Sequence, residues 1–256
     1  MNRGSATASC SPGSRTPRPP GAHGYGFGVT TAPLDLDSTQ AVPQPTLRGP
    51  LPDECEVLLI RHGRSADVVP GSPEAADPPL HVLGVEQAEK LAVRLAGKTI
   101  DAVYSSTLAR ARQTATPLAA ARGLPVVEHL DLEEVRLGDW ANGEFRRRAA
   151  VGDPEWVAWS RTGRWDGIPG GEGDDAFRSR VAGVVEQLVA QHVGQCIAVV
   201  AHGGSINAYV AHLLGVHRSL VFTIENTSIT SVRVGTHGPT LVTVNDCHHL
   251  YDPVLP

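Results

Sequence analysis

Two histidines in this chain follow apolar, strand-like runs, and each is followed directly by glycine. The first lies in LLIRHG at 58–63 and the second in AVVAHGG at 198–204. An imidazole can act as a nucleophile or carry a proton, and an arginine binds anions through its planar fork of N–H donors. A buried strand that ends on Arg61 and His62 must present them either to water or to an anion. A single histidine after a strand is usually only a polar cap. Because the same strand–His–Gly pattern occurs again at His202, we favour the interpretation that these side chains face an anion.

Two further segments carry side chains that suit chemistry on an anion. In SSTLARARQTA at 105–115, Arg110 follows the end of a predicted strand by about one helical turn. In LEEVRLGDW at 132–140, the carboxylates of Glu133 and Glu134 lie in a loop-like context. Arginine suits a phosphate because it donates two parallel hydrogen bonds and keeps its charge. A carboxylic acid can protonate a departing alkoxide and then deprotonate water.

These residues need a scaffold that brings them together, and the hydrophobic pattern predicts strands that alternate with helices. The predicted strands are 55–60, 100–104, 124–127 and 197–201, followed by a hairpin of 228–234 and 240–245. The predicted helices are 85–97, 108–121 with a kink or break at Pro117, a third capped by Asp174 or Asp175, and a fourth ending at Leu214. The stretch 139–172 is expected to be irregular. The pattern predicts an α/β fold, a three-layer sandwich whose mostly parallel central sheet has helices on both faces.

The order of these elements predicts where the charged residues meet. In an open α/β sheet, ligands collect outside the carboxyl ends of the strands. If the strands before His62 and His202 are central and parallel, both imidazoles emerge at the same edge of the sheet. Arg110 then lies within reach of that edge.

The first 52 residues differ in composition from the rest of the chain. They hold nine of the 20 prolines, and Ser, Gly, Thr and Arg fill much of the remainder. Such a stretch cannot bury enough apolar surface to offset the entropy lost on ordering. We therefore predict a disordered tail over 1–52 and a catalytic domain over 53–256, with a regulatory or docking arm as the less favoured interpretation of the tail.

Composition limits the partners. The formal net charge of -5 gives no reason to expect nucleic acid, and no apolar run approaches the length of a membrane span. The four cysteines show no paired spacing, and the amino terminus lacks the apolar core of a signal peptide, so we expect a cytoplasmic protein. The sequence leaves the oligomeric state open, with a homodimer as one alternative.

Taken together, these motifs resemble those of a known family, the histidine phosphatase superfamily, which includes the cofactor-dependent phosphoglycerate mutases. The resemblance covers roughly residues 55–250. Five motifs in the family's order carry it: RHG at 61–63, SSTLARARQTA, the Leu-x-Glu before Gly-Asp-Trp, PGGE at 169–172, and VVAHGG at 199–204. A single RHG tripeptide would carry little weight, because short motifs recur by chance.

Carried over position by position, the resemblance implies that His62 is a nucleophile that forms a phosphohistidine. It implies a proton donor in the 132–140 segment, where the family's register selects Glu134 and leaves Glu133 as the alternative. The implied phosphate contacts are Arg61, Arg110, His202 in its protonated form, and Gly203. Candidates for substrate contacts are Arg64, for which a solvated loop arginine is an equal alternative, Ser65 and Asn207.

The resemblance implies a metal-independent phosphomonoester hydrolase that acts on a small phosphorylated metabolite without a cofactor. A phosphoglycerate mutase is the alternative among enzymes. The mutases follow their catalytic glutamate with Arg-His-Tyr-Gly, whereas this chain has Val-Arg-Leu-Gly at 135–138. A non-catalytic phospho-ligand binding module is the third alternative, and it would require the loss of a core residue, but none is missing.

Two features outside the motifs have competing interpretations. The run Arg146-Arg147-Arg148 could recognise a distal carboxylate or a second phosphate, but a solvated surface is favoured. The tryptophans at 156, 159 and 165 could shape a lid over the substrate, and packing beneath a long loop explains them equally well.

Overall fold

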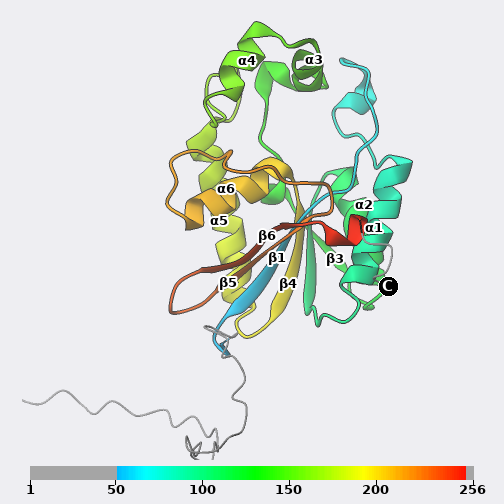
Figure 1. The fold of residues 1–256 in the computed structure, drawn as a ribbon, viewed down its shortest axis with the longest axis vertical. Coiled ribbons are helices and arrows are strands. Elements are labelled where there is room, and N and C mark those ends of the chain that lie inside the picture. The colour runs from blue at the N-terminus through cyan, green and yellow to red at the C-terminus, as the bar shows by residue number, and fades with distance from the viewer. Residues whose placement is uncertain (1–50, 252–256) are drawn as a thin grey trace, which may run out of the picture. The chain divides into compact units, whose positions relative to one another are not determined.

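The structure is a computed structural model that describes residues 51–251. The predicted disordered tail over 1–52 therefore lies outside the described residues except for its last two positions. Figure 1 shows the fold of the described part.

A six-stranded sheet forms the centre of the described part (Figure 1). Its order is β3-β2-β4-β1-β5-β6, in which the first four strands run parallel and β5 is antiparallel to both of its neighbours. The strands are β1 (Cys55–Arg61), β2 (Ala102–Ser106), β3 (Val126–His129), β4 (Cys196–Ala201), β5 (Ile229–Val234) and β6 (Thr240–Asp246). The predicted hairpin is confirmed, and β1 and β4 are the two central strands.

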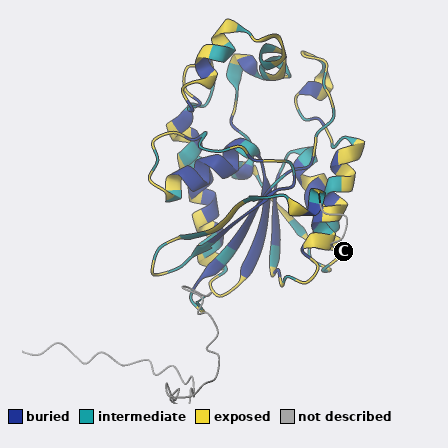
Figure 2. Cartoon of the chain, in the orientation of Figure 1, coloured by how far each residue is buried: buried dark blue, intermediate teal, exposed yellow. Residues whose placement is uncertain are grey.

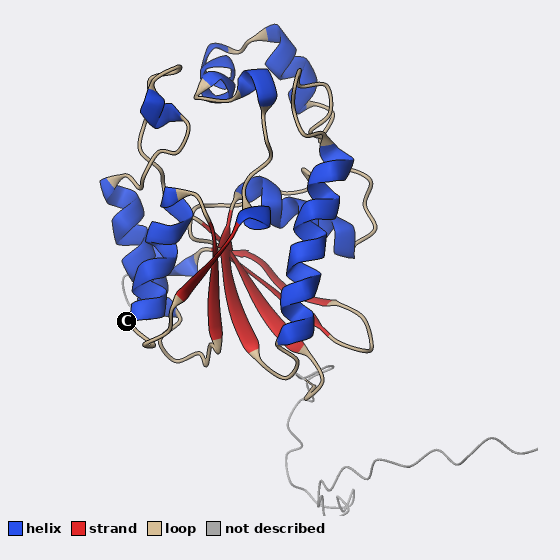
Figure 3. Cartoon of the chain, turned by 180° about the vertical axis from the view of Figure 1, so that it is seen from behind, coloured by secondary structure: helices blue, strands red, loops and turns tan. Residues whose placement is uncertain are grey.

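Helices cover both faces of this sheet (Figure 3). One face carries α1 (Val82–Arg94) and α2 (Ala109–Ala120), and the other carries α5 (Asp174–Gln191) and α6 (Gly203–Leu213). The core is accordingly divided into two clusters of buried side chains, one on each side of the sheet. The predicted three-layer α/β sandwich is confirmed.

The apolar run of β1 follows from this layering. Val57 and Leu59 point into the cluster under α5 and α6, whereas Leu58 and Ile60 point into the cluster under α1 and α2. A strand buried on both faces needs apolar side chains at every position, not at alternate ones. Figure 2 shows the central strands buried along their length and the outer surface of α1 exposed.

The stretch 139–172, which the sequence analysis treats as irregular, contains two short helices, α3 (Glu144–Val151) and α4 (Pro154–Ser160). A cap signal marks the second of them. Asp153 accepts hydrogen bonds from the backbone N–H groups of Glu155 and Trp156, at 3.0 and 3.2 Å, and Pro154 occupies the first turn. This Asp-Pro-Glu sequence is a recognisable helix start.

Two further expectations are wrong in detail. Of the expected kink or break at Pro117, the break does not occur, because α2 continues through Pro117 to Ala120 and loses only the one backbone donor that proline lacks. Neither Asp174 nor Asp175 caps α5, since the capping position is Gly173 and both aspartates lie in the first turn. Within residues 51–251, no helix has both the length and the apolar character needed to cross a membrane.

Candidate active site

His62 follows the last residue of β1 and is only 7% exposed. Its Nδ1 lies 2.7 Å from the carbonyl oxygen of Gly63. A carbonyl can only accept, so this contact assigns the proton to Nδ1 and leaves a lone pair on Nε2. Arg110 Nε donates to that Nε2 at 3.3 Å. The ring is therefore oriented with its unprotonated nitrogen toward a guanidinium.

His202 lies beside His62 because β1 and β4 are adjacent, parallel and in register, with Arg61 opposite Ala201. The two imidazole centroids are 5.1 Å apart. His202 is fully buried, its Nε2 is 2.8 Å from the Ser106 hydroxyl, and its Nδ1 has no hydrogen-bond partner in the described part of the chain. The structure thus brings the two strand–His–Gly units together.

Both imidazoles are held neutral in this state. Burial lowers the pKa of His62 well below its ordinary value, and the positive charges of Arg110 and Arg61 lower it further. Burial also lowers the pKa of His202 well below its ordinary value, with His62 and Arg110 adding to the effect. The expected protonated form of His202 is therefore not the form of the unliganded site. A phosphoryl dianion beside the ring would favour protonation.

Arg61 and Arg110 converge on His62 from β1 and α2. Arg61 donates through Nη1 to the carbonyl oxygen of Ile224, and its buried Nε has no acceptor within residues 51–251. Arg110 lies 3.7 Å from Asp77, whose carboxylate also accepts two hydrogen bonds from the Ala109 N–H at the start of α2. An unpartnered buried N–H of a guanidinium suits a phosphoryl oxygen.

Glu134 and Glu133 differ in their contacts. Glu134 accepts hydrogen bonds from its neighbour, the Val135 N–H, at 3.1 Å and from the Gly204 N–H at 3.0 Å. Its charge acts on both Arg61 and Arg110. Glu133 instead accepts a hydrogen bond from the Thr107 hydroxyl. Both line the same cavity, but Glu134 is the one coupled to the arginines.

A cavity of about 760 Å³ is lined by most of these residues, although the fully buried His202 is not one of them. Its polar lining includes Arg61, His62, Arg110 and Glu134. Its walls also include the apolar side chains of Leu108, Val135, Leu137, Trp140, Phe145 and Trp165. A cavity of this size accommodates more than a phosphoryl group, so a substantial organic group fits beside it.

The other predicted contacts fall into two groups. Arg64 and Ser65 line the cavity, although Arg64 is also 3.4 Å from Asp67 in an exposed pair. Asn207 does not line the cavity: it is 4% exposed, and its amide bonds the backbone of residues 203, 221 and 222. Gly203 also lies outside the lining residues, at the first position of α6. Asn207 therefore holds a loop in this structure and does not face the cavity.

The three arginines of the run 146–148 also differ in whether they line the cavity. Arg147 and Arg148 both pair with Glu144 on α3, as the solvated-surface interpretation expects. Arg146 instead lines the cavity and donates to the Ala66 carbonyl and the Ser65 hydroxyl, at 3.0 and 2.9 Å. The tryptophans pack against one another: the Trp159 ring is edge-on to Trp140 and tilted against Trp156 and Trp165, with ring centroids 5.0 to 6.4 Å apart.

Sequence reasoning missed two residues of the site. Asn226 donates from its side-chain amide to the His62 carbonyl at 2.8 Å, and Asp77 fixes Arg110 and the start of α2. Asn226 precedes β5, which is antiparallel to β1, so its approach to His62 comes from strand pairing. No local sequence pattern predicts that either residue belongs to the site.

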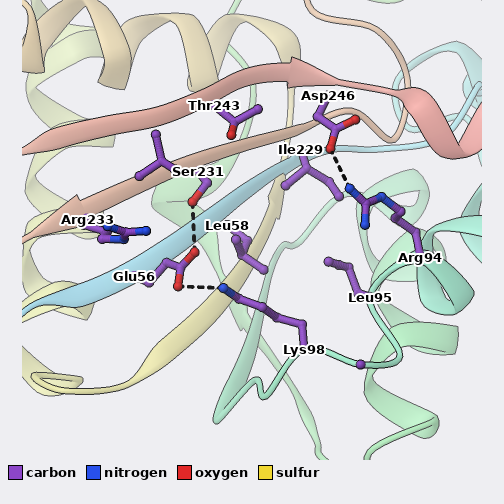
Figure 4. Close-up of a pocket in the computed structure, with 12 residues that line it drawn as sticks. Glu56, Leu58, Arg94, Leu95, Lys98, Ile229, Ser231, Arg233, Thr243 and Asp246 are labelled. Atoms are coloured by element: carbon purple, nitrogen blue, oxygen red, sulfur yellow. Dashed lines mark hydrogen bonds and ion pairs between the residues drawn. The ribbon is translucent and has the colours of Figure 1, made fainter. Parts of the chain in front are cut away.

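A second cavity of about 470 Å³ lies between the end of α1 and the β5–β6 hairpin (Figure 4). Its carboxylates pair with neighbouring cations, Glu56 with Lys98 at 2.7 Å and Asp246 with Arg94 at 3.1 Å. None of the histidines lines it. Within residues 51–251, no group of three or more His, Cys, Asp or Glu side chains is arranged as a metal site.

The two buried histidines make the stability of the fold depend on pH. Because their folded-state pKa values lie below the unfolded value of about 6.5, the unfolded chain binds more protons as the pH falls. Their contribution to stability is complete above that value and is lost below it, by about 1.4 kcal/mol per pH unit for each histidine. Chemical unfolding between pH 7.5 and 5 measures this slope. In the His62→Asn variant, the free energy of unfolding should fall less steeply with decreasing pH, by the contribution of one histidine. Equal pH slopes for the variant and the wild type would contradict a neutral His62.

Known proteins resemble this chain in both sequence and fold. The family model described as histidine phosphatase superfamily (branch 1) matches residues 57–247. The adenosylcobalamin/alpha-ribazole phosphatase of Escherichia coli is 34% identical over 158 residues, which are 61% of this chain and 78% of that protein. The metal-independent phosphoserine phosphatase of Arabidopsis thaliana is 34% identical over 158 residues, 60% of this chain and 66% of that protein. Among solved structures, a mycobacterial glucosyl-3-phosphoglycerate phosphatase aligns with a TM-score of 0.65 at 27% identity, covering 75% of this chain and 99% of that one.

Proposed function

This chain belongs to the histidine phosphatase superfamily, branch 1, and from that premise we propose how its own residues hydrolyse a phosphomonoester. It is a phosphatase of the histidine phosphatase type that acts on a small phosphorylated metabolite. In our proposal the reaction runs through a phosphohistidine on His62. The observation that carries the proposal is the hydrogen bond from His62 Nδ1 to the Gly63 carbonyl, which leaves Nε2 unprotonated beside Arg110.

In the first step, His62 Nε2 attacks phosphorus and the bond from phosphorus to the ester oxygen breaks. Arg61 and Arg110 stabilise the charge on the transferred oxygens, and Glu134 gives its proton to the departing alkoxide, which leaves as the alcohol. The proton on Nδ1 stays in its hydrogen bond to Gly63, so the phosphorylated ring is cationic. A cationic imidazole is a good leaving group for the next step.

In the second step, water attacks the phosphohistidine. Glu134, now a carboxylate, takes a proton from that water, and the bond from phosphorus to Nε2 breaks with its electron pair returning to nitrogen. Inorganic phosphate leaves, and His62 is again neutral with its proton on Nδ1. In both steps His202 supports the phosphoryl group; it takes up a proton from solvent when the dianion binds and returns that proton when phosphate leaves.

Hydrolysis is favoured over phosphoglycerate mutase activity. A mutase must keep water from its phosphohistidine while the substrate reorients, which requires polar groups that grip both ends of the substrate. In this cavity Val135 and Leu137 stand where the mutases have polar residues, and both line it. Rapid interconversion of phosphoglycerates, faster than phosphate release, would restore the mutase alternative.

We also propose a cytoplasmic location. Cys55, Cys196 and Cys247 are free thiols, as a reducing compartment keeps them. Burial raises the pKa of Cys55 to about 11 and that of Cys196 to about 12, so neither is a reactive thiolate.

Phosphate release should persist after treatment with EDTA. Arg61 and Arg110 supply the positive charge that a divalent ion would otherwise bring to the phosphoryl group. The measurement is a panel of phosphomonoesters assayed before and after chelation, with vanadate added as a mimic of five-coordinate phosphorus. We expect unchanged rates with EDTA and strong inhibition by vanadate. Loss of activity with EDTA that magnesium or zinc restores would contradict the proposed function.

A further inference from the structure

Arg180 of α5 forms a buried ion pair with Glu172, the glutamate of the PGGE segment. The guanidinium donates to both carboxylate oxygens, from Nε at 2.7 Å and from Nη2 at 2.8 Å. The side chains are only 11% and 9% exposed. Burying two charges is costly, and such a pair is stable only when its remaining donors and acceptors are also satisfied.

The remaining donors of Arg180 bind the backbone of the turn that carries Glu134. Nη1 donates to the carbonyl oxygens of Asp131 and Glu133, at 2.9 and 3.1 Å, and Nη2 donates to that of Glu134 at 3.4 Å. A guanidinium has five N–H donors, and all five are used here. Three of these five donors therefore hold the backbone that leads up to Glu134, at the carbonyls of residues 131, 133 and 134.

Glu172 fixes the other side of the same turn. Its backbone N–H donates to the Arg136 carbonyl at 2.9 Å, and its carboxylate accepts from the Arg136 N–H at 3.2 Å. Burial alone would raise the pKa of Glu172, but the hydrogen bonds from Arg180 and Arg136 outweigh burial and leave the pKa below its ordinary value. The pair thus holds the chain on both sides of Glu134.

The carboxylate of Glu134 has little freedom of its own. It lies against the first turn of α6, where a Cβ on Gly204 would overlap Glu134 Oε1. One of its two hydrogen bonds comes from the Val135 N–H within the turn, and the other comes from the Gly204 N–H of α6, which does not move with the turn. The position of the carboxylate is therefore set by the backbone of 131–136, and that backbone is set by Arg180 and Glu172.

We propose that Arg180, oriented by its ion pair with Glu172, is a positioning residue that places Glu134 for proton transfer to the leaving group. The inference rests on the proposed function, in which Glu134 is the proton donor. Arg180 itself does not line the catalytic cavity. A lysine would keep the charge but not the geometry, because an ammonium has three donors around one nitrogen and cannot span the carboxylate and three carbonyls.

The test compares two substrates in the Arg180→Lys variant. An alkyl phosphate needs a proton for its leaving group, whereas p-nitrophenyl phosphate has a leaving group that departs readily as the anion. We expect kcat/KM for the best alkyl phosphate of the panel to fall by about 10- to 100-fold, the range for a small misplacement of a catalytic group. The value for p-nitrophenyl phosphate should change by less than about 3-fold on the same argument. Glu172→Gln should change the two kcat/KM values in the same direction as Arg180→Lys does.

The ratio of kcat/KM for the alkyl phosphate to kcat/KM for p-nitrophenyl phosphate does not depend on the fraction of folded enzyme. A merely structural defect therefore leaves this ratio unchanged. The matched control is Arg178→Lys, a residue on the same helix whose nearest carboxylate is Asp174 at 4.0 Å; its ratio should equal that of the wild type. Equal losses on both substrates in Arg180→Lys, or no loss at all, would overturn the positioning role. The Glu134→Gln variant separates the two claims: if it too affects both substrates equally, the assignment of Glu134 as proton donor fails, and the positioning role falls with it.

Discussion

Replacement of His62 by alanine is expected to abolish phosphate release from every phosphomonoester, by a factor of about 10⁴ or more, because the covalent route through the enzyme is lost with its nucleophile. The fold should survive, since His62 lies at the end of β1 and contributes to neither core cluster. Steady-state phosphate release at neutral pH, with circular dichroism to confirm folding, makes the measurement.

The matched control is His212→Ala. His212 also pairs with a neighbouring side chain, Glu186, but its own side chain is 43% exposed and it lies at the far end of α6. This variant should retain full activity. Near-normal rates in His62→Ala would remove His62 from the mechanism.

Replacement of Glu134 by glutamine should lower kcat/KM for alkyl phosphates by about 10²- to 10⁴-fold, the usual worth of a positioned general acid. The amide keeps the size of the side chain but has no proton to give to the alkoxide. The loss should be much smaller for p-nitrophenyl phosphate, because its leaving group needs little protonation.

The neighbouring Glu133→Gln variant is the control for this prediction. Glu133 lines the same cavity but is bound to Thr107, so its loss should affect activity only slightly. A large loss in Glu133→Gln together with near-normal activity in Glu134→Gln would make Glu133 the proton donor.

The meeting of His62 and His202 could be predicted from sequence, because each follows a fully apolar strand, and parallel central strands end at the same edge of a sheet. The same reasoning placed Arg110, one helical turn after β2. These inferences depend on short-range patterns whose spatial outcome the α/β topology dictates.

The contacts that orient these residues could not be predicted in the same way. The glycine of the first motif is needed because α1 packs against it: a Cβ on Gly63 would lie 2.6 Å from the Gly84 carbonyl oxygen. Asn226 and Asp77 reach the site from distant segments. Such contacts depend on long-range packing, which leaves no periodic trace in the sequence.

Asn207 shows the converse error. Its place within the last motif predicted a substrate contact, but its side chain bonds the backbone at 221 and 222 beneath the loop that follows α6. The short helices of 139–172 were missed because they are brief, with eight residues in α3 and seven in α4, and because α3 has no buried residues to mark an apolar stripe. Two local signals could have revealed them: the Asp153 cap marks the start of α4, and Gly152, with its positive φ, marks the end of α3.

The most direct test of the central claim is to trap the phosphorylated enzyme. Enzyme in excess is mixed rapidly with ³²P-labelled p-nitrophenyl phosphate and quenched in alkali, in which a phosphorus–nitrogen bond to histidine survives. We expect label to appear on the protein, to map to His62 and then to decay to inorganic phosphate at a rate that supports turnover. Label that never appears on the protein while phosphate is released, or label that maps to another residue, would contradict the central claim.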